Sequence, residues 1–370
     1  MRIGYDAKRL FCNHRGLGNY SRDLIRILNE YYPENQYDLF TPKIKIDFKI
    51  NPLNTQVIQP NGIYKFLPSS VWRSVGIKSD IKRLGEDIFH GLSQELPIGI
   101  EKMSVKKVIT FHDAIFMRYP ELYASAYRKI FTVKNMQSCR IADRIIAISE
   151  QSRLDAIEFF KADPQKVEVI YQGCNNIFRE KVTLQEKEQV KRKYDLPNDY
   201  LLFVGAIEPR KNIASILHAI YQEKIDIPFI IVGRQTDYTR ELMKLAEQLK
   251  ISKRVQFLHQ VETNDLPAIY QLAQVLIYPS IFEGFGIPIL EALCSETPVI
   301  TSNGSCFEET GGEFTQYINP HDSQEIGFTI QNVLTDSKLQ EIMKIRGLLH
   351  AQMFTDDKIA NRLMTLYKNI

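Results

Sequence analysis

The sequence predicts an α/β protein built from two Rossmann-like, doubly wound parallel-sheet domains, and three observations support this prediction. The chain has 370 residues, a length that suits two domains of roughly 150 to 200 residues each. Short apolar and β-branched runs alternate with segments of helical spacing, as they do in parallel sheets that are covered by helices. A polar, charged stretch at residues 176–199 interrupts this alternation and is expected to be a linker region between the domains.

Residues 1–175 are expected to form the N-terminal domain. Its predicted strands are short apolar runs: Arg2–Ala7, Asp38–Thr41, Asp87–His90, Lys107–Phe111, Arg144–Ile148 and Val167–Ile170. Its predicted helices have apolar residues at helical spacing: Gly18–Tyr31, Ala124–Ile141 and Ser149–Phe160. Ser149 is expected to cap the last of these helices, because a serine oxygen accepts hydrogen bonds from the free N–H groups of a first turn.

Residues 200–354 are expected to form the C-terminal domain. Its predicted strands are Leu201–Gly205, Phe229–Gly233, Val255–Leu258, Val275–Tyr278 and Val299–Thr301. Its predicted helices are Ile213–Tyr221, Thr236–Leu249, Asp265–Ala273, Ile287–Cys294 and Ser323–Leu334. The tail from Lys338 to Ile370 is expected to be helical, with no strand after it.

The composition excludes several classes of protein. Five scattered cysteines without a Cys-x-x-Cys pair argue against a disulfide framework or a zinc site and for a reducing, cytoplasmic environment. No segment approaches the ~18 consecutive apolar residues of a membrane span, and the N-terminus lacks the apolar core of a secretory signal. The chain has no Asp-x-Asp pair, no histidines at metal-ligand spacing, and no Walker A or Gly-x-Ser-x-Gly sequence. We therefore expect no dedicated metal site, and kinase and serine hydrolase functions lack support.

The net charge of +3 is unevenly distributed along the chain. Residues 1–175 contain 26 Lys and Arg against 19 Asp and Glu, whereas residues 176–370 contain 21 against 25. The N-terminal half is the better candidate for contact with an anionic partner, and chance asymmetry is the alternative. Within it, Tyr64–Leu84 mixes apolar and basic residues, as an interfacial helix at an anionic membrane does. A helix packed on the domain with a solvated basic edge is the other interpretation.

Residues that follow predicted strands are the first candidates for a site, because ligands of open parallel sheets bind beyond the carboxyl ends of the strands. Arg210 and Lys211 follow the strand Leu201–Gly205. Two adjacent cations suit a phosphate or pyrophosphate, and arginine can grip it with two hydrogen bonds. The alternative is an ordinary solvated loop with a basic pair.

A second candidate is the loop FEGFG, which follows a later predicted strand and opens a helix. The N–H groups of Phe285, Gly286 and Ile287 are expected to point at an anion from the start of this helix. Glu283 lies before the turn and Glu291 about one turn into the helix. Two such carboxylates suit hydroxyl groups at opposite ends of one elongated ligand. A ligand with phosphate in its middle and hydroxyls at both ends is a sugar nucleotide.

The N-terminal half offers two further candidates. Gly16 and Gly18 precede the first long predicted helix and form a second glycine-rich helix entry, able to face phosphate. This stretch matches the Gly-x-Gly-x-x-Gly pattern of dinucleotide-binding proteins poorly. Ser21 stands at the position of the third glycine, and the turn begins well after the strand ends. His112 and Asp113 follow the strand Lys107–Phe111. A histidine at a strand exit beside an aspartate favours a site role, although a lone histidine is more often structural.

Taken together, these residues resemble the family 4 glycosyltransferases, and the resemblance covers nearly the whole chain. Its strongest part is FEGFGIPILEALCSETPVITS, which contains the family's Glu-x7-Glu signature as Glu283 and Glu291. Other matching segments are RGLGNYSRDL, FHDAIF, VGAIEPRKN and EETGG. The resemblance implies the GT-B fold, in which two Rossmann-like domains face each other across a cleft. It also implies that the C-terminal helix, residues 355–370, crosses back to the N-terminal domain.

The resemblance implies roles for the residues of the C-terminal half. Glu291 resembles the glutamate that binds the ribose hydroxyls of the donor nucleotide, and Glu283 resembles the one that contacts the donor sugar. The backbone of the FEGFG loop and the helix start would hold the sugar and the distal phosphate. Arg210 and Lys211 would neutralise the pyrophosphate.

In the N-terminal half, the resemblance places His112 at the donor sugar and the reacting centre. Gly16 and Gly18 would form a loop that closes over the phosphates or meets the acceptor. Two positions depart from the family pattern. Ala206 stands where many relatives have an arginine after the strand glycine, a duty that the arginine of the Pro-Arg-Lys sequence would take over. Glu296 stands where relatives often have glycine, so it bears a modest strain if that turn needs a positive φ.

The expected function is that of a retaining glycosyltransferase that works without a metal or cofactor. The EPRKN sequence resembles that of bacterial mannosyltransferases of surface-polysaccharide assembly, so GDP-mannose is the first expected donor. The expected acceptor is a saccharide or a lipid-linked molecule at the inner face of the membrane, and no nucleic-acid partner is expected. The alternatives are a UDP-sugar-dependent transferase of the same family and a non-catalytic nucleotide-sugar-binding protein. An epimerase would not require the FEGFG loop, and a Rossmann dehydrogenase would carry a tight glycine turn after its first strand.

Overall fold

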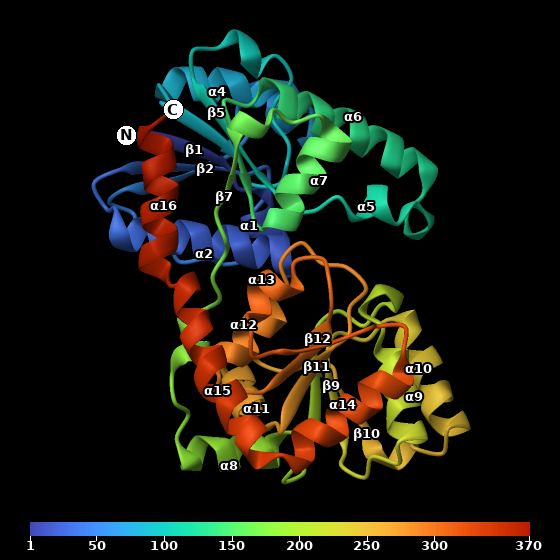
Figure 1. Ribbon diagram of the computed structural model, residues 1–370. Coiled ribbons are helices and arrows are strands. Elements are labelled where there is room, and N and C mark those ends of the chain that lie inside the picture. The colour runs from blue at the N-terminus through green and yellow to red at the C-terminus, as the bar shows by residue number, and fades with distance from the viewer. The chain divides into compact units, whose positions relative to one another are not determined.

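The computed structural model describes residues 1–370 and divides the chain into two compact units, each with its own parallel sheet (Figure 1). Unit 1 contains Met1–Gly173 together with Phe354–Ile370, and unit 2 contains Cys174–Met353. The C-terminal segment therefore belongs to the same unit as the N-terminus. No helix in either unit combines the length and the apolar character that crossing a lipid bilayer requires.

The sheet of unit 1 has seven strands in the order β3-β2-β1-β4-β5-β6-β7, and all neighbours are parallel. The strands are β1 (Arg2–Asp6), β2 (Gln36–Phe40), β3 (Thr55–Ile58), β4 (Ile88–Gly91), β5 (Lys106–Phe111), β6 (Arg144–Ala147) and β7 (Val167–Val169). The winding reverses between β1 and β4, which makes their carboxyl ends the topological switch point of the sheet. The central strand β4 is buried along its whole length, as a strand covered on both faces must be.

The helices of unit 1 build two apolar cores against this sheet. They are α1 (Lys8–Cys12), α2 (Gly16–Tyr31), α3 (Ser69–Val71), α4 (Ile77–Leu84), α5 (Ile115–Arg118), α6 (Ser125–Ile141), α7 (Glu150–Phe160) and α16 (Asp356–Lys368). One core contains Phe111 and Phe160, whose ring centroids are 5.4 Å apart. The other contains Trp72 and Phe89 and lies under α4. Ser149 caps α7 by accepting a hydrogen bond from the N–H of Ser152, so that prediction is confirmed.

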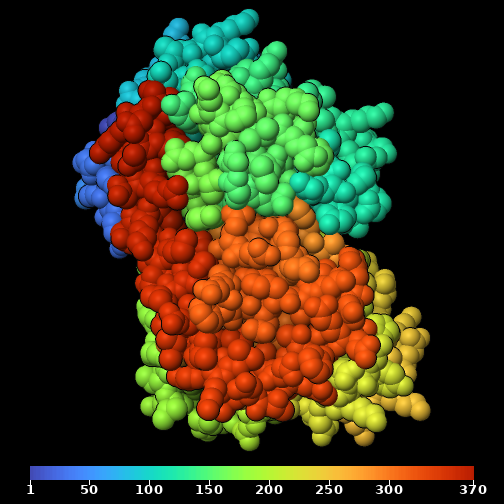
Figure 2. Space-filling view, viewed as in Figure 1, coloured from blue at the N-terminus to red at the C-terminus, as the bar shows by residue number.

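The C-terminal helix α16 packs beside α2 within unit 1. The guanidinium group of Arg26 on α2 lies 2.8 Å from the carboxylate of Asp356 at the start of α16. Near the other end of α16, the hydroxyl of Tyr367 lies 2.7 Å from Nδ1 of the buried His90 on β4. Figure 2 shows this red helix lying next to the blue N-terminal segment.

The sheet of unit 2 has six parallel strands in the order β10-β9-β8-β11-β12-β13. They are β8 (Leu201–Val204), β9 (Phe229–Val232), β10 (Val255–Leu258), β11 (Val275–Tyr278), β12 (Val299–Ser302) and β13 (Gln316–Ile318). The helices are α8 (Leu184–Lys193), α9 (Ile213–Gln222), α10 (Asp237–Gln248), α11 (Leu266–Leu272), α12 (Ile287–Cys294), α13 (Phe307–Gly311), α14 (Ser323–Thr335) and α15 (Ser337–Ala351). The switch point of this sheet lies between β8 and β11.

The two strands that the sequence pattern misses, β3 and β13, are both at sheet edges. β3 is only partly buried, and β13 has three residues. An edge strand pairs on one side only, so neither segment needs the apolar run that marks a central strand.

The region expected to link the domains, residues 176–199, lies within unit 2 and contains α8. This helix begins with a capping box, in which Thr183 Oγ accepts from the N–H of Glu186 and the Glu186 carboxylate accepts from the N–H of Thr183. Only Val190 of α8 is buried. A helix with so small an apolar face gives little periodicity for a sequence pattern to detect.

The segment Tyr64–Leu84 is one run of helical turns only from Ser69 to Leu84, and its contact with a membrane stays a prediction. It contains α3, a π-helical turn from Trp72 to Gly76, and α4. Trp72, the first residue of the π-helical turn, is fully buried and hydrogen-bonded to Asp80 at 3.1 Å. Phe66, in contrast, is 88% exposed. The segment therefore splits its apolar residues between the core and the surface.

Candidate active site

Two loops meet at the switch point of unit 2, where β8 and β11 end side by side. The loop after β8 carries Arg210 and Lys211, and the loop after β11 carries Ser280 and Glu283. The backbone N–H of Ile281 donates to the carbonyl of Arg210 at 3.0 Å and joins the two loops. The sheet topology thus brings together candidates that lie about seventy residues apart in the sequence.

The buried carboxylate of Glu283 is the centre of this arrangement. Lys211 forms an ion pair with its Oε1, and an arginine nitrogen of Arg210 lies 2.9 Å from the same oxygen. Ser280 donates a hydrogen bond to it at 2.6 Å and Tyr278 at 3.1 Å. All four contacts are made to Oε1, so Oε2 is the carboxylate oxygen that is left to accept from a ligand.

The protonation state of Glu283 follows from these contacts. Burial disfavours the charged form, but the charges of Lys211 and Arg210 and the hydrogen bonds from Lys211 and Ser280 outweigh it and lower the pKa of Glu283 to about 2. Burial also lowers the pKa of Lys211, which Glu283 opposes. Glu283 is thus ionised at neutral pH, as a fixed acceptor of hydrogen bonds should be.

The start of α12 lies directly after this carboxylate in the chain. Gly286 precedes the helix with φ of 91°, a left-handed conformation that strains other residues. The loop is fixed by Thr310 Oγ1, which donates to the carbonyl of Phe285 at 2.5 Å, and by Ser305 Oγ, which donates to that of Glu283 at 3.0 Å. Pro288 occupies the first turn, where its missing N–H removes no helical hydrogen bond. Pro288 has no N–H to offer and Ile289 donates its own to the carbonyl of Gly286 at 2.9 Å, so the N–H of Ile287 is the one that the first turn of α12 can offer to an anion.

Glu291 lies on α12 and is held separately from the Glu283 cluster. The hydroxyl of the buried Tyr270, on α11, donates to Glu291 Oε2 at 2.8 Å. Burial and the negative charge of Glu291 raise the pKa of Tyr270 well above its ordinary value, so this hydroxyl keeps its proton and acts as a donor. The Tyr270 hydroxyl thereby helps to orient the half-buried carboxylate.

In unit 1, His112 follows β5 and is buried at the carboxyl edge of the sheet. Its Nε2 lies 2.8 Å from the carbonyl of Leu92, which can only accept, so the proton is on Nε2 and Nδ1 has the free lone pair. Tyr20 packs edge-on against the ring at 4.8 Å. Burial and the positive charge of Arg9 lower the pKa of His112 to about 4, so the ring is neutral at pH 7.

The two candidate glycines of unit 1 differ in their surroundings. Gly16 and Gly18 both lie in the first turn of α2. A Cβ at Gly18 would lie 1.8 Å from the carbonyl oxygen of Asn13, whereas one at Gly16 would meet nothing within 4 Å. Gly18 is thus required by packing within the unit, and only Gly16 stands beside open space.

The structure brings Arg210, Lys211 and Glu283 into direct contact, together with two partners that were not among the predicted site residues, Tyr278 and Ser280. Tyr278 is the last residue of β11 and Ser280 follows the strand. The rule that selected Arg210, by which ligands bind beyond the carboxyl ends of strands, applies to both residues. Across unit 1 and unit 2, no group of three or more His, Cys, Asp or Glu side chains has the arrangement of a metal site.

Comparisons with known families match almost the whole chain in two parts. A family model described as Glycosyl transferases group 1 matches residues 185–349, and one described as Glycosyltransferase Family 4 matches residues 14–176. The first match lies in unit 2, and the second covers most of unit 1 and ends at the start of unit 2.

Curated relatives include two O-antigen mannosyltransferases. The chain is 29% identical over 286 residues to O-antigen chain mannosyltransferase B of Escherichia coli, a match that covers 76% of this chain and 74% of the relative. It is 31% identical over 230 residues to O-antigen chain mannosyltransferase RfbU of Salmonella typhimurium, covering 61% of this chain and 60% of the relative. The second match therefore spans less than two thirds of the relative's length.

Solved structures share the architecture at lower identity. Sucrose-phosphate synthase from Thermosynechococcus elongatus superposes with a TM-score of 0.82 at 21% identity, covering 100% of this chain and 98% of that one. Anabaena Alr3699/HepE in complex with UDP and glucose superposes with a TM-score of 0.78 at 18% identity, covering both chains fully. These likenesses confirm the predicted fold of two Rossmann-like, parallel-sheet domains.

Proposed function

We infer the activity from the family to which the chain belongs, the family 4 glycosyltransferases with the GT-B fold. We propose that the protein transfers a hexose from a nucleotide-sugar donor. The observation that carries this proposal is the Glu283 carboxylate, paired with Lys211 and Arg210 at the switch point of unit 2 and followed by the N-terminus of α12. A carboxylate, two cations and a helix start suit sugar hydroxyls beside a diphosphate.

The proposed donor site uses each of these groups in turn. Glu283 accepts hydrogen bonds from the sugar hydroxyls through Oε2, while its other oxygen stays with Lys211. The diphosphate takes the N–H groups at the start of α12 and the charges of Arg210 and Lys211. Glu291, oriented by Tyr270, accepts the ribose hydroxyls of the nucleotide. His112 is proposed to contact the donor sugar through its free Nδ1.

We propose that transfer retains the anomeric configuration and needs no metal. Arg210, Lys211 and the α12 N-terminus stabilise the diphosphate as its bond to the anomeric carbon breaks. The leaving phosphate oxygen takes the proton of the acceptor hydroxyl, whose oxygen bonds to the anomeric carbon from the face that the phosphate leaves. Glu283 positions the sugar and forms no covalent intermediate. A glycosyl adduct trapped on Glu283, or full activity in Glu283→Gln, would refute this mechanism.

Mannose is the first proposed hexose, with GDP-mannose as its donor and a polysaccharide precursor as acceptor. The support is the identity to the O-antigen mannosyltransferases of Escherichia coli and Salmonella typhimurium. A UDP-sugar donor is the second candidate, favoured by the complex of Anabaena Alr3699/HepE with UDP and glucose. The alternative of a non-catalytic nucleotide-sugar-binding protein would be excluded by any measurable turnover of a nucleotide-sugar donor.

We also propose that the protein transfers the sugar to a saccharide or lipid-linked acceptor at the inner face of the membrane. The support is the surface of unit 1, where Phe66 and Val75 are exposed in a segment that carries five basic residues and one acidic residue from Tyr64 to Leu84. Flotation with vesicles that contain anionic lipid tests this contact. Protein that stays with the soluble fraction at low salt would refute it.

The test of the donor site is a thermal-shift titration with UDP, GDP, ADP and NAD, each with EDTA and with magnesium. A ligand at 100 times its Kd stabilises the folded state by about 2.7 kcal/mol, which raises the Tm by a few degrees. We expect a shift with one nucleoside diphosphate that persists in EDTA and disappears in Glu291→Ala. Glu247→Ala, an exposed change on α10, is the matched control and should keep the shift. A shift with NAD alone would overturn the proposed function.

A further inference from the structure

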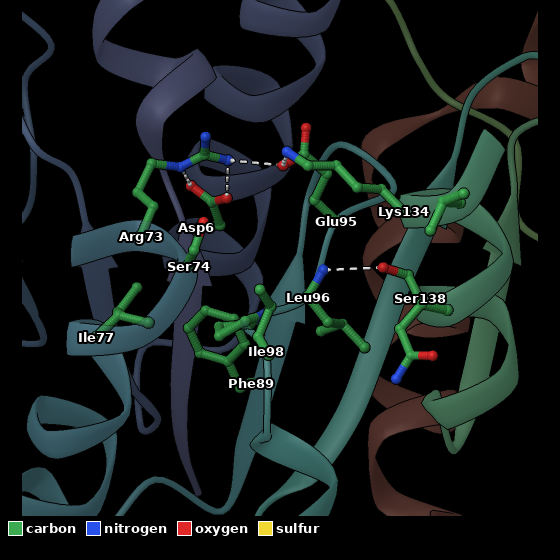
Figure 3. A pocket seen from close by; sticks show the side chains of 13 residues that line it. Asp6, Arg73, Ser74, Ile77, Phe89, Glu95, Leu96, Ile98, Lys134 and Ser138 are labelled. Atoms are coloured by element: carbon green, nitrogen blue, oxygen red, sulfur yellow. Dashed lines mark hydrogen bonds and ion pairs between the residues drawn. The ribbon is translucent and has the colours of Figure 1, made fainter. Parts of the chain in front are cut away.

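Unit 1 contains a cavity of about 290 Å³ that no role described so far uses (Figure 3). Its lining includes Asp6, the last residue of β1, and Glu95, which follows the neighbouring strand β4. These strands flank the switch point of the sheet, which is where ligands of doubly wound sheets collect. Protein interiors are close-packed, so a cavity of this size at this position is a candidate binding site.

The body of the cavity is apolar. Phe89 of β4 forms its floor, Ile77 of α4 forms one wall, and Leu96 and Ile98 of the loop after β4 form another. The loop is fixed by its contact to α6, where the N–H of Leu96 donates to Ser138 Oγ at 3.1 Å. The walls therefore come from elements that are packed and hydrogen-bonded, which favours a preformed pocket.

One end of the cavity is charged, and Figure 3 shows the charged side chains gathered there. Asp6 pairs with Arg73 at 2.5 Å, and Glu95 lies 3.8 Å from Arg73 and 3.3 Å from Lys134. Burial and the charges of Arg73 and Arg9 lower the pKa of Lys8 nearby. The lining itself has two cations and two carboxylates at this end, and Lys8 lies near enough to interact with them, so this extra positive charge suits an anion.

Lys134 is the cation best placed to leave its partner for a ligand. Its side chain is 46% exposed, whereas that of Arg73 is 13% exposed. Exposed ion pairs are weak, and Glu95 keeps Arg73 as a neighbour if Lys134 turns away. An anionic ligand could therefore form an ion pair with Lys134, and no buried charge would be left without a partner.

The mouth of the cavity continues into exposed apolar surface. Ile98 and Val133, which both line the cavity, are each 68% exposed, and Val75 on the adjoining turn is 46% exposed. The helix α6 that carries Val133 has four basic residues and no acidic residue. A contiguous apolar patch beside cations is typical of a surface that binds an amphipathic molecule.

We propose that this cavity binds the hydrocarbon part of an amphipathic acceptor whose phosphate group lies at Lys134. The assignment of the ligand as acceptor rests on the proposed transferase function, whereas the binding of a hydrocarbon chain with an anionic group does not. At about 30 Å³ for each group of the size of a water molecule, the cavity has room for roughly ten such groups along a chain. A longer chain would extend over Ile98 and Val133 at the mouth.

The test uses decyl phosphate as probe and the single tryptophan as reporter. Trp72 belongs to the apolar core that contains Ile77 and Phe89, two residues of the cavity wall. Its fluorescence should therefore respond when a chain fills the space. Decyl phosphate, decyltrimethylammonium and inorganic phosphate are each titrated below their micelle-forming concentrations into the full-length protein. We expect saturable binding of decyl phosphate, at least tenfold weaker binding of the cationic analogue, and none of phosphate alone.

Two pairs of variants assign this binding to the cavity. Ile98→Glu puts a charge at the apolar mouth and should weaken decyl phosphate roughly tenfold or more, while Leu53→Glu, at an 87% exposed position outside the lining, should not. Lys134→Ala should weaken decyl phosphate about threefold and leave the cationic analogue unchanged; Lys129→Ala, exposed on the same helix, is its control. All four positions are exposed, so folding should survive.

Several outcomes would overturn the inference. Absence of saturable decyl phosphate binding, equal binding in Ile98→Glu, or equal affinity for the cationic analogue each contradicts it. The proposed function is tested independently, because nucleoside diphosphates act on residues of unit 2. Decyl phosphate binding without any nucleotide shift would leave the cavity assignment standing and refute the transferase.

As an activity readout, a decyl-phosphate-linked saccharide and the free saccharide are compared as acceptors. We expect the wild type to prefer the linked form and Ile98→Glu to lose that preference. Equal use of both forms by the wild type would remove the acceptor role.

Discussion

Lys211 and Glu283 form a buried ion pair across the two loops that end β8 and β11, and the same carboxylate oxygen lies 2.9 Å from Arg210. The two cations are therefore held together by one anion. Loss of the carboxylate would leave the buried Lys211 without its charge partner and Arg210 with Glu208 alone, 2.7 Å away, whereas loss of Lys211 would still leave Arg210 to pair with Glu283. This asymmetry has a measurable consequence.

We predict that Glu283→Gln destabilises the protein more than Lys211→Met. Removing one partner of a buried pair costs about 3 to 5 kcal/mol. We expect Glu283→Gln to lower the free energy of unfolding by an amount in that range, and Lys211→Met to lower it by about 2 kcal/mol less. Chemical denaturation of both variants and of the double variant measures these free energies. The double variant should be more stable than the sum predicts. Arg240→Met, which removes an exposed ion pair to Asp237, serves as control, and additive effects would contradict the prediction.

The depressed pKa of Glu283 predicts a specific loss of stability in acid. The carboxyl binds a proton below about 4.5 when unfolded but only near pH 2 when folded, so the unfolded state binds more protons between these values. The stabilisation, about 3 kcal/mol, is present above pH 4.5 and is lost as pH falls toward 2. Unfolding free energies of wild type and Glu283→Gln across this range should converge. Parallel curves would show that Glu283 is not the group responsible.

The lowered pKa of His112 predicts a second loss of stability in acid, at higher pH than the loss that comes from Glu283. The pKa of its imidazole is about 4 in the folded protein against 6.5 ordinarily, so protons bind preferentially to the unfolded chain between pH 6.5 and 4. Stability should fall by about 3 kcal/mol over this window. Differential scanning calorimetry of His112→Gln should show a reduced pH dependence. His321→Gln, at an exposed position, is the control, and an unchanged slope in His112→Gln would refute the assignment.

The sequence predicted the central part of each sheet well, because central strands need continuous apolar runs. The central strand β11 begins and ends where the pattern places it, and α12 matches the predicted Ile287–Cys294. The edge strands β3 and β13 were missed because they are short and pair on one side only. α8 was missed because its single buried residue, Val190, leaves no apolar stripe to detect.

The candidate site was predictable in its residue types but not in its pairing. Strand-end positions and the Glu-x7-Glu signature selected Glu283, Arg210 and Lys211, but a sequence assigns the cations to phosphate and cannot show that they already neutralise a carboxylate. Likewise, the two glycines before α2 look equivalent in sequence. Only the position of the Asn13 carbonyl separates the packing role of Gly18 from the open surroundings of Gly16.

The two glycines should therefore respond oppositely to alanine. In Gly18→Ala the new Cβ meets a backbone oxygen at 1.8 Å, which cannot move as a side chain does, so we expect a loss of about 2 to 3 kcal/mol or more. In Gly16→Ala the Tm should stay within a degree or two, because alanine favours a helix and meets no atom. If Gly16 approaches the ligand, as the family resemblance implies, its alanine variant should raise KM without loss of stability. Equal Tm values for the two variants would contradict the packing role of Gly18.

Glu296 offers a stabilising change that the sequence already indicated. Its φ of 56° confirms that the turn after α12 needs a left-handed residue, and a residue with a side chain is strained there by roughly 1 kcal/mol. Its carboxylate pairs with Lys181, which is 73% exposed, and such a pair contributes little. We predict that Glu296→Gly raises the stability of unit 2 by about 0.5 to 1 kcal/mol, seen as a Tm increase of a few degrees. Glu296→Ala removes the same ion pair without relieving the backbone and should not raise the Tm. If both variants lower it equally, the ion pair outweighs the strain and the prediction is wrong.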